Sequence, residues 1–346
     1  LFVVFSGVVL ALSAALHAAG LAVAHPLTGE TVAVTNLVSA EGLRRLALNV
    51  VPNFIGFAPL GPVLVSLMGL SVAERSGLLG AVVRAIVGAT PPRVLTLMIV
   101  FCGAISHTVG DVGYVLLIPL GAALFHSMGR HPLGGLAAAF YGVSGGFAAN
   151  ILLSPTDVVL AGLTQEAARL LDPAATVSPL ANYYFLAAST VFITITGTVV
   201  TERVVLPRLG AYTGAMRPEP TVQLSAAERR ALAWALASMA VLGALVLWGL
   251  LPADGVLRDP AKPAFVDSVL VRGLVFFLFV GGLVPGVVYG KLAGTIRRDA
   301  DVYKGMQENL ELLASYLVVV FFIAQFVALF NWSNLGVVLA VHGATA

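Results

Sequence analysis

Apolar stretches of membrane-spanning length recur along the chain, separated by polar and basic segments. A helix needs about 20 mostly apolar residues to cross a bilayer. Six segments fit this template: Leu1–Ala24, Val50–Leu70, Tyr183–Leu206, Ala231–Leu251, Ser268–Gly290 and Leu310–Phe330. The pattern predicts an all-α, polytopic membrane protein.

Two further apolar regions are interrupted by small and polar residues. Val94–Met128 contains the polar, glycine-containing run Ser106–Gly113 in its middle. Leu133–Leu163 is interrupted at residues 144–146 and again at residues 154–157. Glycines lower helix stability, and Pro155 removes a backbone donor and clashes with the preceding turn. The second region therefore predicts a broken helix.

The basic residues predict how the spans are oriented. Lys and Arg concentrate on the cytoplasmic side, and the densest clusters are Arg203–Arg230 and Lys291–Lys304. Two spans lie between these clusters, so both clusters fit the cytoplasm, as do most of the 19 basic residues. Arg93 and Arg130, which flank Val94–Met128, then lie on the same side.

That placement predicts a re-entrant helical hairpin over Val94–Met128. Two arms of about 15 residues reach roughly 22 Å, which is most of a hydrocarbon core of about 30 Å. Two full spans joined by a short outer turn are the alternative, and they need longer arms or a thinner bilayer.

Two shorter segments carry their own signals. Ser71–Gly88 has three charged residues among apolar ones and is either an interfacial amphipathic helix or a cytoplasmic loop helix. Gln223–Arg230 predicts a helix start, because Ser225 is a good N-cap residue and Glu228 follows three residues later.

Composition agrees with the membrane assignment. Apolar residues make up 59% of the chain and charged residues 10%, against about 25% charged in soluble domains. The net charge of +2 points to neither nucleic acid nor acidic partners. The single cysteine, Cys102, cannot form an internal disulfide and is expected to be a small buried hydrophobic residue.

Both ends of the chain look like cut points. It begins at Leu1 inside an apolar run without a basic leader segment, which favours a first span over a signal peptide. Asn331–Ala346 stops without a closing element. We therefore expect a fragment.

The breaks in the second interrupted region predict a substrate and ion site. Backbone breaks at membrane depth are tolerated where they line a cavity or face protein, and such broken helices form the sites of secondary transporters. Ser144, Gly145 and Gly146 would supply the broken backbone. Side-chain oxygens for a cation or a substrate amine would come from Asn150, Ser154, Thr156 and Asp157. The alternative is a proline-kinked helix whose small residues pack against neighbours.

The middle of the hairpin is the second candidate. Ser106, His107 and Asp111 would lie at its tip, where a histidine beside a carboxylate can relay protons. An inert tip that hydrogen-bonds to its own backbone is the alternative. Two ligands four residues apart are weak evidence for a metal, so we expect no metal site.

Motifs for nucleotide-driven and zinc-dependent chemistry do not occur. The sequence contains neither G-x-x-x-x-G-K-[ST] nor H-E-x-x-H. We expect neither an enzyme nor a bound cofactor.

Six motifs follow in order along the whole chain: Leu48–Phe54, Gly61–Leu64, Ala73–Gly77, Ser106–Tyr114, Ser144–Asn150 and Phe330–Gly336. Together they resemble the motifs of one transporter family, the AbgT family of p-aminobenzoyl-glutamate transporters. The chain corresponds to about the first two-thirds of a family member and lacks the C-terminal third.

The resemblance implies a dimer in which each protomer has a scaffold and a transport core. Two re-entrant hairpins and two broken helices, related as inverted repeats, build the core. Residues 1–93 and 166–306 would be scaffold, with cytoplasmic loops at 207–228 and 291–306. Residues 94–165 would be the first core repeat, and 307–346 the truncated start of the second. Asp157 matches a family aspartate implicated in transport.

The implied activity is secondary transport across the bacterial inner membrane. The resemblance implies uptake of p-aminobenzoyl-glutamate or export of sulfonamide-type antimetabolites, driven by a gradient of Na⁺ or H⁺. A dicarboxylate or other anion transporter of similar architecture stays open, as does an intramembrane enzyme that uses His107 and Asp111.

Overall fold

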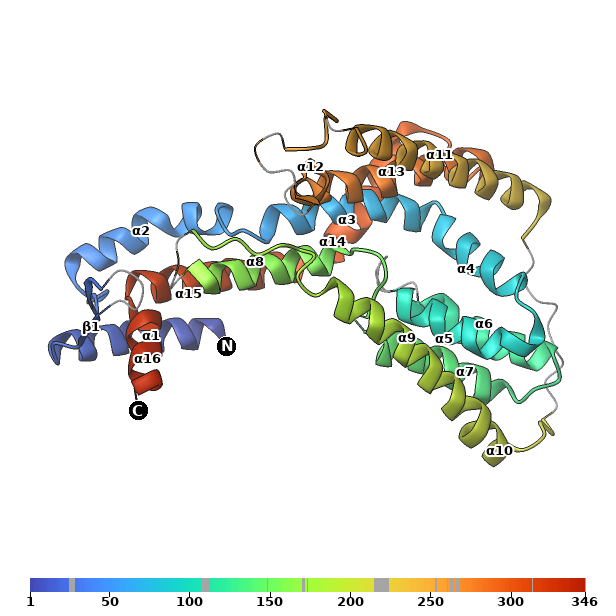
Figure 1. Cartoon of the computed structure of the whole chain (residues 1–346), viewed down its shortest axis with the longest axis horizontal. Coiled ribbons are helices and arrows are strands. Elements are labelled where there is room, and N and C mark those ends of the chain that lie inside the picture. The colour runs from blue at the N-terminus through green and yellow to red at the C-terminus, as the bar shows by residue number, and fades with distance from the viewer. Residues whose placement is uncertain are drawn as a thin grey trace. The chain divides into compact units, whose positions relative to one another are not determined.

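Helices account for nearly all of the regular structure in the computed structural model (Figure 1). The structure describes residues 1–24, 29–106, 113–147, 149–169, 172, 174–214, 224–252, 254–259, 261, 264, 265, 268–312 and 314–345. They form two units. The first unit contains Leu1–Leu64, Val159–Val177 and Leu310–Ala346, and the second contains Val65–Val158 and Ser178–Asn309.

The first unit combines helices from both ends of the chain with a small antiparallel hairpin. It contains α1 (Phe2–Ala18), α2 (Ala40–Ile55), α15 (Ala314–Trp332) and α16 (Leu335–Thr345). Strands β1 (Ala22–Ala24) and β2 (Thr31–Ala33) pair so that Ala22 lies opposite Ala33. Their core includes Val34, Leu37, Leu335 and Val338, which are almost completely buried.

The hairpin corrects the first predicted span. We expected Leu1–Ala24 to be one helix, whereas α1 ends at Ala18 and the chain continues into β1. Gly20 has a φ of 67°, a conformation that glycine adopts readily and that stops a helix. Thus α1 is a shorter apolar helix of 17 residues.

The second unit holds the first interrupted region, the second one as far as Val158, and most of the remaining helices. These are η1 (Pro92–Val94), α5 (Leu95–Ile105), η3 (Gly113–Leu117), α6 (Ile118–Ser127), α7 (Pro132–Phe140), η4 (Tyr141–Gly145), α9 (Tyr183–Val200), η5 (Thr201–Val205), α10 (Leu206–Leu209), α11 (Ala226–Leu250), α12 (Val269–Arg272), α13 (Leu274–Ala293) and α14 (Asp299–Leu312). Leu95, Ile99, Phe125, Ala138 and Val143 form its central core and are fully buried. That core therefore lies between α5, α6, α7 and η4.

Five segments of the described residues are long and apolar enough to cross a membrane. They are Ala40–Arg75, Tyr183–Leu209, Ala226–Leu250, Leu274–Ala293 and Ala314–Trp332, and each overlaps a span that we predicted. The first combines α2 with α3 (Leu60–Arg75). These spans confirm the predicted class of an all-helical, multi-pass membrane fold, with β1 and β2 as a small addition.

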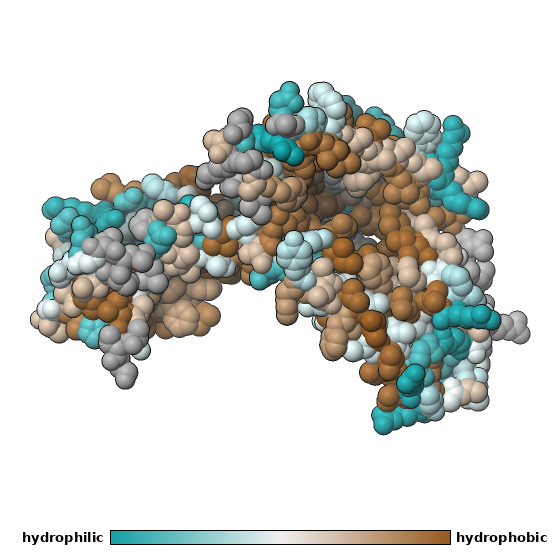
Figure 2. Space-filling model, viewed as in Figure 1, coloured by the Kyte–Doolittle hydropathy of each residue, from teal (hydrophilic) through white to brown (hydrophobic). Residues whose placement is uncertain are grey.

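Large apolar side chains on these helices are exposed. Figure 2 shows apolar residues along α9 and hydrophilic ones gathered at its α10 end. On α9, Phe185 and Phe192 are both more than half exposed, as are Trp234 and Trp248 on α11. A water-soluble surface rarely carries such large apolar patches, so these faces fit contact with lipid.

The segment predicted as one helix over Ser71–Gly88 is divided. Helix α3 runs through Arg75, and α4 (Leu78–Gly88) starts after Gly77, whose φ is 84°. The predicted bounds were therefore wrong. Helix α4 is amphipathic, and it buries Leu78 and Ala81 in one apolar cluster and Val87 in another. Its position relative to a membrane stays a prediction.

The predicted helix start at Ser225 is confirmed. Ser225 caps α11, its Oγ accepts from the Glu228 N–H at 3.2 Å, and Glu228 Oε2 accepts from the Ser225 N–H at 2.8 Å. This reciprocal pair is a capping box.

Candidate functional site

The first interrupted region turns back on itself. At one end Ser106 lies beside Gly113, where an added Cβ would come within 2.2 Å of the Ser106 Oγ. At the other end Arg130 Nη1 donates to Thr96 Oγ1 at 3.1 Å. Arms α5 and α6 are therefore antiparallel, which fits both the predicted re-entrant hairpin and the alternative of two full spans joined by a short turn. His107 and Asp111 lie outside the described residues, and the depth of the tip in a membrane stays a prediction.

The second interrupted region is a broken helix, as predicted. Helix α7 continues into the π-turn η4, and an irregular stretch follows before α8 (Pro155–Arg169) begins. The helical structure ends at Gly146, the residue after η4, and a Cβ added there would come within 2.3 Å of the Gly142 carbonyl oxygen. A side chain at residue 146 would therefore obstruct this path.

The hairpin and the broken helix meet directly within the second unit. The hydroxyls of Tyr114 and Ser144 are 3.2 Å apart, which joins η3 of the hairpin to η4 of the broken helix. An added Cβ at Gly103 would come within 2.7 Å of the Gly142 carbonyl carbon, and one at Gly146 within 2.7 Å of the Ala104 Cα. The two segments thus touch backbone to backbone.

The π-turn also contacts α9. The hydroxyls of Tyr141 and Thr196 are 3.0 Å apart, and an added Cβ at Gly197 would strike the Tyr141 ring at 2.3 Å. Each end of η4 therefore reaches a different neighbour. π-turns inside helices occur frequently at functional sites.

Asp157 lies in the first turn of α8 and caps it. Its Oδ2 accepts from the backbone N–H of Ser154 at 2.7 Å and from the Ser154 hydroxyl at 2.8 Å. A carboxylate here interacts favourably with the positive end of the helix dipole. Asp157 thus has a structural task in addition to any part it takes in binding.

Asn150 stabilises the irregular stretch. The residue is only 3% exposed, and its Oδ1 accepts from the Leu152 N–H at 3.2 Å. This is an Asx-type turn, in which the side chain bonds to the backbone two residues on. The local backbone bonds therefore hold the break open in a defined shape.

The predicted site residues fall into two contact groups. Ser106, Ser144 and Gly146 belong to the contact between hairpin and broken helix, and Ser154 and Asp157 form the cap of α8. Gly145 and Thr156 are exposed at the two sides of the break. Joint binding of one ligand by these groups stays a prediction.

The contact of Tyr114 with Ser144 was not predicted from the sequence, where Tyr114 is the last residue of the motif Ser106–Tyr114. Its position directly after Gly113 could have indicated the contact, because a residue next to a tight turn readily reaches the facing element. Ser106 Oγ donates to the Gly103 carbonyl at 2.7 Å, and its part in a binding site stays a prediction.

A charged cluster at the base of the hairpin was also missed. Arg130 Nη2 donates to both carboxylate oxygens of Glu202 at 2.5 Å, and the Thr96 hydroxyl also donates to that carboxylate. Glu202 lies in η5, so the cluster ties both ends of the hairpin to the α9 segment. A single acidic residue in an otherwise apolar span was the signal.

Ser144 also lies in a run that spells G-x-S-x-G, residues 142–146. A hydrolase nucleophile in this motif sits on a sharp strand-to-helix turn. Here Ser144 lies in a π-turn that follows a helix, and its hydroxyl pairs with that of Tyr114. The geometry does not support an acyl-transfer site. Among the described residues no group of three or more His, Cys, Asp or Glu side chains is placed to hold a metal.

Comparison with known proteins identifies relatives over the whole chain. The sequence matches the AbgT putative transporter family over residues 1–346. It is 39% identical over 342 residues to the p-aminobenzoyl-glutamate transport protein of Escherichia coli K12, covering 99% of this chain and 67% of that protein.

Two solved structures share the fold. The YdaH transporter of Alcanivorax borkumensis, described as having an unusual topology, has a TM-score of 0.92 and 41% identity, over 99% of this chain and 72% of that chain. MtrF of Neisseria gonorrhoeae, described as illuminating a class of antimetabolite efflux pumps, has a TM-score of 0.93 and 42% identity, over 99% of this chain and 71% of that chain. The chain is a multi-pass membrane protein that belongs to the AbgT putative transporter family.

Proposed function

We propose that the chain is the part of a secondary active transporter that carries the first hairpin and the first broken helix of the transport core. The cargo is p-aminobenzoyl-glutamate on uptake or a sulfonamide-type antimetabolite on export. The Escherichia coli relative is named for p-aminobenzoyl-glutamate transport, and the Neisseria gonorrhoeae relative is described as an antimetabolite efflux pump. The sulfonamide type of antimetabolite is our own proposal.

The hydrogen bond between Tyr114 and Ser144 carries the proposal. It joins two interrupted apolar segments whose backbones also touch at Gly103 and Gly142. Interrupted helices at such points build transporter sites, because polar backbone at membrane depth needs a protein or cavity partner. A single apolar kink would need neither the second interrupted segment nor the buried polar residues Ser106, Asn150 and Ser154.

The Asp157 carboxylate supplies the negative charge of the site. Both hydrogen bonds from Ser154 reach Oδ2, so Oδ1 can take a coupling cation or a substrate amine. A carboxylate in hydrocarbon costs about 2.5–3.5 kcal/mol on the insertion scale. A bound Na⁺, a proton or an amine would offset that cost. Transport coupled to such an ion would require no bound cofactor.

Replacement of Asp157 by Asn in the complete gene product, reconstituted in vesicles, tests this role. The amide oxygen can still accept from Ser154, so α8 stays capped while the charge is lost. We expect substrate flux to fall at least tenfold with unchanged assembly. Asp172→Asn is the matched control, since Asp172 also accepts a local backbone bond, from Ala174 at 2.9 Å, and is exposed.

Normal flux in Asp157→Asn would show that the carboxylate only caps the helix. Flux measured against imposed Na⁺ and pH gradients assigns the coupling ion. A dicarboxylate transporter would instead move succinate-like anions in the same vesicles. An intramembrane enzyme would convert its substrate without a gradient.

The same proposal places the protein in the bacterial inner membrane as a homodimer, with a second hairpin and broken helix related to the first by inverted symmetry. The exposed aromatic faces of α9 and α11 are available for lipid or for a second protomer. Cross-linking in native membranes tests the dimer.

A further inference from the structure

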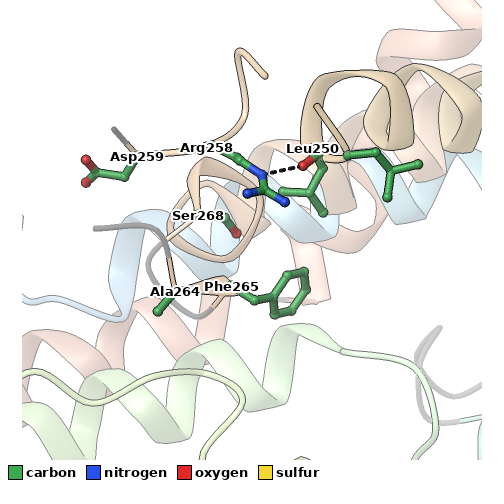
Figure 3. A pocket seen from close by; sticks show the side chains of 7 residues that line it. Leu250, Arg258, Asp259, Ala264, Phe265 and Ser268 are labelled. Carbon is green, nitrogen blue, oxygen red and sulfur yellow. Dashed lines mark hydrogen bonds between the residues drawn. The ribbon is translucent and has the colours of Figure 1, made fainter. Parts of the chain in front are cut away.

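One hollow of the second unit lies at the loop that joins α11 to α12 (Figure 3). Its volume is about 300 Å³, and Arg258, Asp259 and Phe265 are among its lining residues. Arg258 Nε donates to the Leu250 carbonyl at 2.7 Å, and Asp259 pairs with Arg272 at 3.1 Å. Its charged residues therefore already stabilise the end of α11 and the loop.

A larger hollow of about 450 Å³ lies among α4, α6 and α11. Its wall is apolar, and its rim carries two arginines, Arg84 and Arg229. The apolar lining includes Val87, Leu120, Leu124, Met128, Leu224 and Leu232. The hollow thus combines hydrocarbon surface with positive charge in one place.

The rim keeps a net positive charge after its internal pairing. Arg84 Nη2 donates to Glu228 Oε1 at 2.8 Å, and Arg84 Nε donates to the Gly80 carbonyl at 3.3 Å. A guanidinium carries five N–H donors, more than these two bonds use. Arg229 is exposed at the rim, so two positive charges face one negative charge.

We propose that this groove binds an anionic phospholipid. The phosphate would lie between Arg84 and Arg229, and an acyl chain would lie along Leu120, Leu124 and Leu232. Basic pockets between membrane helices recognise anionic head groups, and each Lys or Arg near such a surface contributes about 1 kcal/mol. The amphipathic helix α4 would bring the rim to head-group level.

This site goes beyond transport itself, because it lies on residues that the proposed substrate site does not use. Helix α6 is an arm of the hairpin, whereas α4 and α11 belong to the predicted scaffold. A lipid in the groove would therefore contact both and hold the hairpin arm against the scaffold helices. Anionic lipid would then regulate how readily that arm moves.

The complete gene product in nanodiscs tests the proposal, with phosphatidylcholine alone or mixed with phosphatidylglycerol. Native mass spectrometry counts the lipids that the protein retains. We expect wild type to retain phosphatidylglycerol selectively. Arg229→Gln should weaken retention about fivefold, which corresponds to about 1 kcal/mol. Gly88→Leu should abolish retention, because Gly88 lines the groove and an added Cβ meets nothing within 4 Å.

Matched controls separate the groove from general surface charge and from glycine replacement. Arg230→Gln removes the neighbouring exposed charge, and Gly243→Leu changes an exposed glycine of α11 whose added Cβ also meets nothing. Both should retain phosphatidylglycerol like wild type. Unchanged retention in Gly88→Leu and Arg229→Gln would overturn the proposal. Displacement of the lipid by millimolar inorganic phosphate would also overturn it, because it would show a free-anion site.

Discussion

Replacement of Gly103 by Ala probes the contact between the hairpin and the broken helix. The new Cβ would lie 2.7 Å from the Gly142 carbonyl carbon and 2.8 Å from its Cα. Carbon atoms pack best at about 3.5–4.0 Å, so α5 must move away from η4 by about 1 Å. The obstructing atoms are backbone, which cannot rotate aside as a side chain can.

The expected magnitude follows from two opposing effects. Overpacking of this kind costs about 1–3 kcal/mol, and Ala in place of Gly within a helix recovers about 1 kcal/mol. Gly103→Ala should therefore lower the free energy of unfolding by up to about 2 kcal/mol. Gly243→Ala in α11 meets no atom within 4 Å and should raise it by about 1 kcal/mol.

Denaturation of both variants in detergent micelles measures the difference, and vesicle transport measures its effect on function. We expect Gly103→Ala to be less stable than Gly243→Ala by about 1–3 kcal/mol, with reduced flux because the Tyr114–Ser144 contact is stretched. Equal stabilities of the two variants would refute the close contact. Adding Gly142→Ala should be less than additive, since both replacements open the same contact.

Three further results are expected. Glu202→Gln should lower the free energy of unfolding by about 1 kcal/mol, because the pair with Arg130 is only partly buried. Arg130→Lys should lower it by a similar amount. Unchanged denaturation of both variants would argue against the cluster. The N–H groups of Arg298 and Arg297 both donate to Asp301, which lowers the pKa of that carboxyl below its ordinary value near 3.8, with the Arg298 bond the largest cause. This cap should hold above pH 3.8 and be lost only as the pH falls through the lower folded pKa. Hydrogen exchange at residues 297–301 that shows equal protection in wild type and in Asp301→Ala at every pH would contradict it. A cysteine placed at residue 129 should react with impermeant label from the cytoplasmic side, as should the loops Arg208–Arg230 and Arg297–Lys304, and labelling from the periplasm would exclude the hairpin topology.

Local sequence signals predicted those features that depend on neighbouring residues. The capping box at Ser225 follows from a serine and a glutamate three residues apart. The broken helix follows from glycines and a proline in one apolar region. In both cases the conformational preference of a few adjacent residues decides the outcome.

Features that depend on distant residues could not be predicted in this way. Thr96 and Glu202 are 106 positions apart, and nothing in either local sequence names the other as its partner. The pairing of β1 with β2 involves only three residues per strand, too few to show an alternating pattern. For Asp157, the sequence showed a costly carboxylate but not that Ser154 would satisfy one of its oxygens.

The π-turn η4 determines the rotational phase of the broken helix. Each residue of an α-helix advances about 100° around the axis, and a π-turn accommodates one residue more than an α-turn. Tyr141 meets α9, whereas Ser144 meets the hairpin, although residues three apart share a face in a regular α-helix. Deletion of one residue here would restore regular winding and aim one of these side chains away from its partner. The spacing within residues 141–145 is therefore as restrictive as the residue types.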